Sequence, residues 1–193
     1  MNSTTQDFAL WTSFREGEKQ ALGQLLQRYH SVLKHYGLKF RVDESIVEDC
    51  IQELFLQLHQ NRCQINATES VKHYLLKALR HHILQYLRAQ KRITYEELNW
   101  DGTGAADLDS ETLLIRQESL DKLTKLMHVR MAALPNRERE ALYLRFYEDL
   151  SISQIAEVMQ VNPQSVSNFL QKALTKLRSQ WWVSLFLTIC TFF

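Results

Sequence analysis

Residues 151–176, SISQIAEVMQVNPQSVSNFLQKALTK, contain the strongest structural signals in the C-terminal part of the chain. Ser151 and Gln154 have the spacing of a capping box, in which two side chains bond reciprocally to backbone N–H groups at the start of a helix. The helix that they open is short and ends near Gln160. Its apolar residues recur at helical spacing and are predicted to share one face: Ile152, Ile155, Ala156 and Met159.

A second helix follows after three residues. Asn162 is a favourable N-cap, and Pro163 suits the first helical position. The apolar residues of this helix again form one stripe: Val166, Leu170, Ala173, Leu174 and Leu177. Two short helices joined in this way, with the small Ala156 where they cross, predict a helix-turn-helix, although Gln160 stands where a glycine is common.

The other face of the second helix is rich in amides and hydroxyls, which are the groups that read base edges in DNA. Six of these polar residues are candidate DNA contacts: Gln164, Ser165, Ser167, Asn168, Gln171 and Lys172. A helical hairpin with a polar, solvated face would show the same periodicity and the same caps. The pattern alone therefore leaves both interpretations open.

The rest of the chain also predicts helices. Its 193 residues include only 5 glycines and 2 prolines, and alternating runs rich in Val, Ile and Thr are nearly absent. Helical periodicity predicts two helices over 8–36, broken at Gly17 and ended by Gly37. Further helices are expected over 44–60, 70–91, 112–134 and 137–147. The fold class is therefore all-α.

Charge and composition divide the chain into segments. The formal net charge is +1, but residues 94–118 hold seven acidic residues against one basic residue, while the segments on either side are mildly basic. Residues 94–110 lack a helical period and contain Gly102 and Gly104, as a flexible linker does. We predict a domain at 8–93, an acidic linker at 94–111, a second domain at 112–180 and an apolar tail at 181–193. Basic flanks suggest contact with nucleic acid, but a solvated linker between ordinary domains fits equally well.

The tail is 13 residues long and has no charged residue. A helix that spans a bilayer needs roughly 17–25 residues, so we expect no stable span, and the role of the tail stays open. Three widely spaced cysteines predict no disulfide framework, and residues 1–7 do not resemble a signal peptide. We therefore expect a cytoplasmic protein.

Several segments together resemble the extracytoplasmic-function (ECF) group of bacterial sigma-70 factors. Residues 134–142 (LPNREREAL), 151–159 and 172–178 resemble the C-terminal domain of that group, which binds the promoter's −35 element. Residues 47–56 (VEDCIQELFL) resemble the polymerase-binding helix of its N-terminal domain. Residues 71–92 resemble the helix that engages the melted −10 element.

The resemblance implies an alternative sigma factor that binds core RNA polymerase and promoter DNA, with an anti-sigma factor as a third partner that no residue here identifies. Glu48, Asp49, Gln52 and Glu53 are the implied polymerase contacts, and helical spacing gathers them on one side. The loop 62–70 resembles the element that holds a flipped −10 base. The implied −10 residues are Asn66, Ser70, Tyr74, Arg80, His81, Gln85, Arg88, Lys91 and Arg92.

The chain departs from the family in the −10 helix. His81 stands where the family often has Asn, Gln85 where it often has Asp, and Tyr74 where it usually has Trp. These three differences bear on the −10 sequence preference and leave the expected fold unchanged.

No catalytic constellation stands out. The chain lacks a Gly-rich phosphate loop and a nucleophile motif, so we expect neither an enzyme nor a cofactor. Residues Cys63, His73, His81 and His82 do not have the spacing of zinc motifs, and no metal site is expected. Two alternatives stay open, a helix-turn-helix regulator that is not a polymerase subunit and a helical metalloenzyme.

Overall fold

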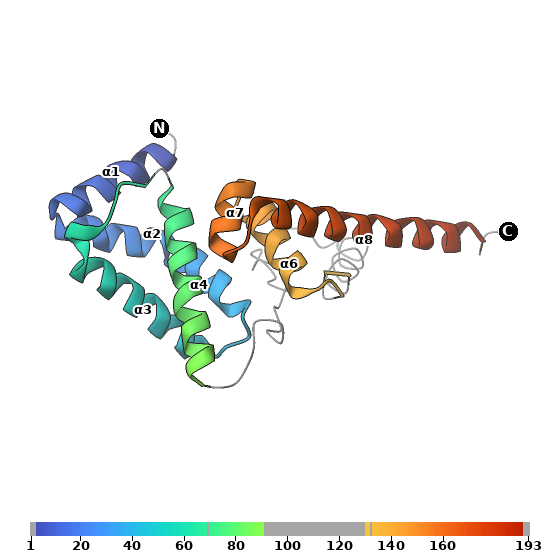
Figure 1. Ribbon diagram of the computed structural model, residues 1–193, viewed down its shortest axis with the longest axis horizontal. Helices are drawn as coiled ribbons and strands as arrows, with labels where there is room; N and C mark the ends of the chain where they lie inside the picture. The colour runs from blue at the N-terminus through green and yellow to red at the C-terminus, as the bar shows by residue number, and fades with distance from the viewer. Residues whose placement is uncertain (1–2, 69, 91–129, 132, 191–193) are drawn as a thin grey trace, which may run out of the picture. The chain divides into compact units, whose positions relative to one another are not determined.

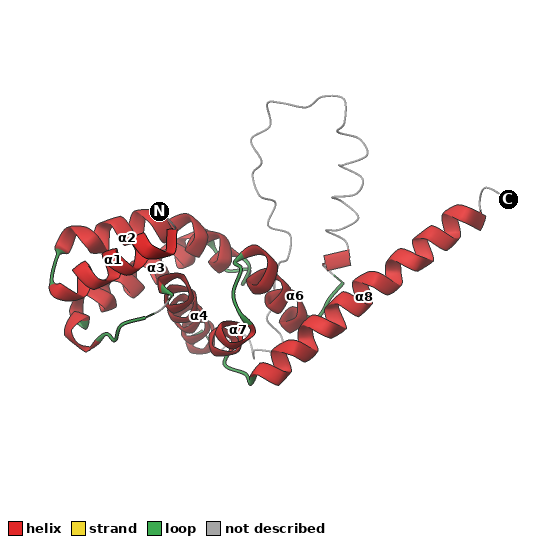
Figure 2. Ribbon diagram, turned by 90° about the horizontal axis from the view of Figure 1, so that it is seen from above, coloured by secondary structure: helices red, strands yellow, loops and turns green. Residues whose placement is uncertain are grey.

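The computed structural model describes residues 3–68, 70–90, 130–131 and 133–190. The chain divides into two compact units, Met1–Asn99 and Trp100–Phe193. The described residues form helices and loops without a strand, which confirms the all-α expectation (Figures 1 and 2). The expected linker at 94–111 and most of the helix expected at 112–134 lie outside the described residues.

The first unit contains α1 (Ser3–Glu16), α2 (Lys19–Leu38), α3 (Glu44–Gln60), a 3-10 turn η1 (Arg62–Gln64) and α4 (Val71–Ala89). α1 packs on α2, α2 on α3, and α4 on both α2 and α3. Gly17 has a φ of 112° and ends α1 in a conformation that favours glycine, and Ser70 Oγ caps α4 by accepting from His73 N at 3.3 Å. The large side chains that fill the core come from all four helices: Trp11, Phe14, Leu25, Leu33, Tyr36, Ile51, Leu54, Leu75, Leu76, Leu79 and Ile83.

The sequence predicted that Gly37 ends α2, and this prediction is wrong. The helix continues to Leu38, and Gly37 is buried within its last turn. A Cβ atom at this position would collide with Val47 Cγ1 of α3 and would lie 3.4 Å from Ile83 Cδ1 of α4. Gly37 is therefore needed for close packing between helices rather than for the helix terminus.

The second unit contains α6 (Asn136–Leu142), a π-helical turn η2 (Tyr143–Tyr147), α7 (Ile152–Met159) and α8 (Pro163–Cys190). The predicted capping box is present, because Gln154 N donates to Ser151 Oγ and Ser151 N donates to Gln154 Oε1. Asn162 Oδ1 accepts from Ser165 N at 2.7 Å. These caps confirm the expected starts of both helices of the helix-turn-helix.

Between the two helices, Gln160 adopts a φ of 56°, in the left-handed region where a glycine would be free of strain.

Two residues that the sequence pattern placed on the apolar faces of these helices are exposed. Leu174 is 46% exposed and Ile152 is 38% exposed. Over residues 163–178 of α8, the part whose burial the structure describes, the buried stripe is narrower than the sequence pattern and consists of Val166, Leu170 and Ala173, while Leu177 is half-buried.

α8 does not stop where the apolar tail begins. Its backbone stays helical from Pro163 through Cys190, so residues 181–190 extend the second helix of the helix-turn-helix (Figure 1). Among the helices of the described residues, none combines the length and the apolar composition needed to cross a bilayer.

Candidate nucleic-acid and polymerase interfaces

The start of α8 presents a polar surface. Gln164, Asn168, Gln171 and Lys172 are exposed, and Ser165 and Ser167 are half-buried. Gln164 Nε2 donates to Asn168 Oδ1 at 3.2 Å, so the two amides lie side by side one turn apart. All six predicted residues of this helix therefore lie at or near the surface.

Two lysines one turn apart on α8 differ in their surroundings. Lys176 Nζ lies 2.9 Å from each carboxylate oxygen of Glu138, which is 5% exposed and belongs to α6. Lys172 is exposed. Lys176 is thus part of the packing between α6 and α8, whereas the position of Lys172 suits contact with a phosphate group.

The predicted acidic face of α3 is only partly presented outward. Asp49, Gln52 and Glu53 are exposed. Leu56 lies on the same side of the helix and is 49% exposed, so this face also carries an apolar side chain that the pattern of polar residues did not predict.

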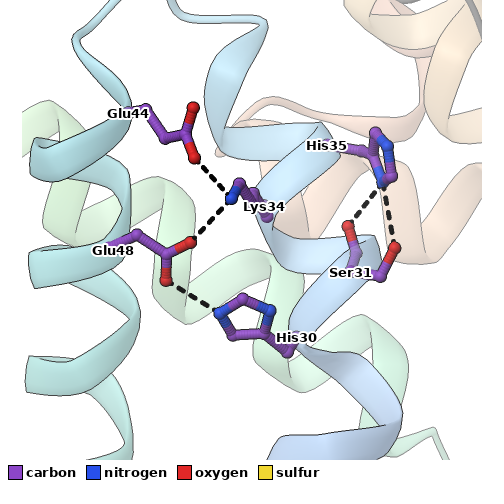
Figure 3. Close-up of polar contacts among 6 residues, drawn as sticks. All are labelled: His30, Ser31, Lys34, His35, Glu44 and Glu48. Carbon is purple, nitrogen blue, oxygen red and sulfur yellow. Dashed lines mark hydrogen bonds and ion pairs between the residues drawn. The ribbon is translucent and has the colours of Figure 1, made fainter.

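Glu48 was predicted to belong to this outward face, but its carboxylate points toward α2 (Figure 3). Its Oε2 lies 2.7 Å from His30 Nε2, and its Oε1 lies 3.1 Å from Lys34 Nζ, which also lies 2.6 Å from Glu44 Oε1. Desolvation opposes ionisation of Glu48, but the bonds from His30 and Lys34 outweigh it and lower the pKa of the carboxyl group. Glu48 therefore joins α3 to α2.

The residues expected to engage the −10 element are divided between the surface and the interior. His81, Gln85 and Arg88 are exposed at offsets of four and seven residues, so they share one face of α4, and Asn66 is exposed in the loop before it. Lys91 and Arg92 lie outside the described residues.

Three other residues of this set have structural contacts. Arg80 is 2% exposed, which corrects its assignment to the DNA-facing surface. The ring of Tyr74 lies 5.0 Å from that of Trp11, and burial raises the pKa of its phenol. Ser70 uses its hydroxyl to cap α4.

Within the described residues, no group of three or more His, Cys, Asp or Glu side chains is arranged to hold a metal ion. Cys63, His73, His81 and His82 are therefore not brought together as a ligand set.

Two family models match the chain in the order of its two units. Residues 25–93 match "Sigma-70 region 2", and residues 125–177 match "Sigma-70, region 4". Together they cover more than half of the chain. The second match includes α6, α7 and the first half of α8, and the first begins within α2, after α1 has ended.

The curated proteins that the chain resembles are also sigma factors. "RNA polymerase sigma factor SigF" of Mycobacterium tuberculosis is 34% identical over 93 residues, which are 45% of this chain and 36% of that protein, so the match spans about a third of its length. "RNA polymerase sigma factor SigV" of Bacillus subtilis is 29% identical over 135 residues, 68% of this chain and 74% of that protein. "ECF RNA polymerase sigma-E factor" of Haemophilus influenzae is 28% identical over 163 residues, 79% of this chain and 83% of that protein.

Among solved structures, that of CnrH in complex with the cytosolic domain of CnrY has a similar fold, with a TM-score of 0.60 at 16% identity over 92% of this chain and 97% of that chain. The order of the two matched regions, the relatives and the all-α fold agree with one another. The chain belongs to the sigma-70 family of RNA polymerase sigma factors, with relatives in its ECF group.

Proposed function

We propose that this chain is an alternative sigma factor, which binds core RNA polymerase and directs it to promoter DNA for initiation of transcription. The observation that carries the proposal is the presence of both sigma-70 regions in order, the second of them built around a helix-turn-helix with exposed amides. The predicted boundaries, domains at 8–93 and 112–180 around an acidic linker at 94–111, belong to this proposal.

In this proposal the start of α8 enters the major groove of the −35 element. The N-terminal residues of a recognition helix are the ones that reach base edges. Gln164 and Asn168 occupy these positions, with Gln171 one turn beyond Asn168, and amides pair well with adenine. Lys172 is placed further along, where a cation neutralises a phosphate. Ser165 and Ser167 contribute hydroxyls at the margin of the contact.

The −10 element is assigned to the exposed side of α4 and the loop before it. Arg88 neutralises backbone phosphates, and His81, Gln85 and Asn66 offer hydrogen-bonding groups to unpaired bases. Lys91 and Arg92, which follow α4 in the sequence, belong to the proposed −10 contacts as two further cations. The protein acts by binding alone, without hydrolysing nucleotide and without a cofactor, and it works in the cytoplasm, where the polymerase meets DNA.

Core polymerase is assigned to the outer face of α3. Asp49, Gln52 and Glu53 provide charge and hydrogen bonds, and Leu56 adds apolar area, a combination that fits a basic partner surface with an apolar centre. We also propose regulation by an anti-sigma protein. CnrH, which has a similar fold, was solved in complex with the cytosolic domain of CnrY, and this supports a protein partner for the present chain as well.

The decisive test is transcription in vitro with purified core polymerase and a library of random promoter fragments. We expect start sites that share one −35 and one −10 sequence and that depend on both proteins. A helix-turn-helix regulator of another kind would bind DNA without core polymerase and would not initiate.

The polymerase contact has its own test. Asp49→Lys combined with Glu53→Lys should abolish co-purification with core polymerase and leave the unfolding transition unchanged. The matched control, Glu16→Lys combined with Glu18→Lys, reverses two exposed charges elsewhere in the same unit. A folded Asp49/Glu53 variant that still co-purifies would contradict the assignment of this face.

A further inference from the structure

The loop between α3 and α4, residues 61–70, is held in place by α1. Arg15 Nε donates to Ile65 O at 2.9 Å, and Trp11 Nε1 donates to Asn66 O at 3.2 Å. Two consecutive carbonyl groups at the centre of the loop are thus bound by residues 50 and 55 positions earlier in the chain.

The Trp11 donor is fixed by its surroundings. Its side chain is 1% exposed and its ring packs against Phe14 at 5.7 Å and against Tyr74 at 5.0 Å between ring centroids. Tyr74 is in the first turn of α4, directly after the loop. Packing against neighbours on α1 and α4 therefore orients the indole, and its N–H donates to the loop.

The loop is also held where it begins. A Cβ atom at Gly17 would lie 2.9 Å from Arg62 Nη1, so the Arg62 guanidinium group lies against the turn that ends α1. Ile65 is buried, while the side chain of Asn66 is exposed although its carbonyl is bound. The backbone of the loop is therefore bonded to α1, while the polar side chain of Asn66 stays exposed.

We propose that Trp11 and Arg15 are positioning residues for recognition of the −10 element. They fix the backbone of the loop so that its exposed groups meet an unpaired base in one register. The inference rests on the proposed function, which assigns this loop to −10 DNA. Both residues precede the segment matched by the region 2 family model, residues 25–93.

The physical reason is geometric. Hydrogen bonds to a base edge weaken steeply when the donor and acceptor depart from their preferred distance and angle. A loop freed from α1 would still offer the same polar groups, but over a range of positions. Discrimination among the four bases would then decrease more than overall binding.

Two variants remove the bonds. Trp11→Phe keeps an aromatic ring without the N–H group, at the expense of a smaller side chain in the core. Arg15→Met keeps the apolar stem of an exposed side chain without the donor. Thr12→Ala is the control, because its Oγ1 donates to Phe8 O within α1 rather than to the loop.

Each variant would be assayed with core polymerase on promoters that carry each of the four bases at every −10 position, with a matched set for −35. We expect base discrimination to fall about 2- to 10-fold at one −10 position, as the loss of one hydrogen bond implies. Discrimination at −35 and affinity for core polymerase should stay at the wild-type values, as should every property of Thr12→Ala. The melting temperature should stay near the wild-type value in Arg15→Met, whereas the smaller ring of Trp11→Phe lowers it.

Unchanged −10 discrimination in Arg15→Met would overturn the inference, even if Trp11→Phe failed to fold. An equal loss at all −10 and −35 positions, with a lower melting temperature, would also overturn it, because it would show a purely structural role. If the wild-type protein failed to support initiation from any promoter, the proposed function itself would fall.

Discussion

The exposed start of α8 and the middle of α4 carry similar polar residues but are packed differently. Over residues 163–178 of α8 a single stripe of Val166, Leu170 and Ala173 is buried, so the predicted DNA contacts all lie at or near the surface. α4 packs against α1, α2 and α3 and buries eight of its residues, among them Arg80. Polar residue types therefore predict exposed side chains reliably on a helix that packs against neighbours along one face. They predict them less reliably on a helix such as α4, which packs against three others.

The strongest test of this contrast is Arg80→Ala. Removing a side chain that is 2% exposed leaves a cavity and unsatisfied partners, so we expect a loss of about 3 kcal/mol or more in the free energy of unfolding. Arg88→Ala, on the exposed side of the same helix, should change it by about 0.5 kcal/mol or less. Urea unfolding of both variants measures the difference. An Arg80→Ala protein as stable as wild type would contradict the structural role of Arg80 and favour its original assignment as a DNA contact.

The next largest effect concerns the two amides of α8. Gln164→Ala or Asn168→Ala should each cost roughly 1–3 kcal/mol on the cognate −35 sequence and relax discrimination at one base pair. Because Gln164 Nε2 donates to Asn168 Oδ1, the two losses should not be additive, and a double-mutant cycle on cognate and mismatched duplexes would measure their coupling. If each substitution weakened binding equally on every DNA sequence, the two amides would contact the sugar-phosphate backbone of the DNA and not the bases.

Lys172 and Lys176 allow a comparison within one helix. Lys176→Ala should reduce the free energy of unfolding by about 1–2 kcal/mol, because it leaves the buried Glu138 without this partner. Lys172→Ala should leave stability unchanged, weaken all DNA sequences about equally and lower the salt slope of binding by about 1. Titrations at several salt concentrations, together with urea unfolding, separate the two roles, and interchanged results would place the helix in another register.

The smallest expected effect is on α3, where Glu48 is engaged with His30 and Lys34. Because its pKa is lowered in the folded protein, Glu48 stabilises the fold at pH values above the usual carboxyl range, and this contribution is lost as the pH falls through the folded-state pKa. Glu48→Gln should therefore be less stable than wild type by at most about 1 kcal/mol near neutral pH. The two proteins should converge in acid, and a constant difference at every pH would exclude ionisation of Glu48 as the cause.

Local signals in the sequence were sufficient for much of the fold. The capping box at Ser151, the Asn162 cap and the bounds of α3 were predicted correctly, because each depends on residues a few positions apart. The burial of Arg80 and the bonds from Arg15 and Trp11 could not be predicted in this way. They depend on which helices pack together, and the bonds from α1 span 50 and 55 positions.

Gly37 has a consequence for genetics. Any side chain there would meet Val47 and push α3 away from α2, together with the outer face that carries Asp49 and Glu53. A screen for alleles that lose polymerase binding should therefore recover substitutions of this buried glycine beside those of the exposed acids. Suppressors of a Gly37→Ala allele are expected among smaller residues at position 47, since they restore the space between the helices.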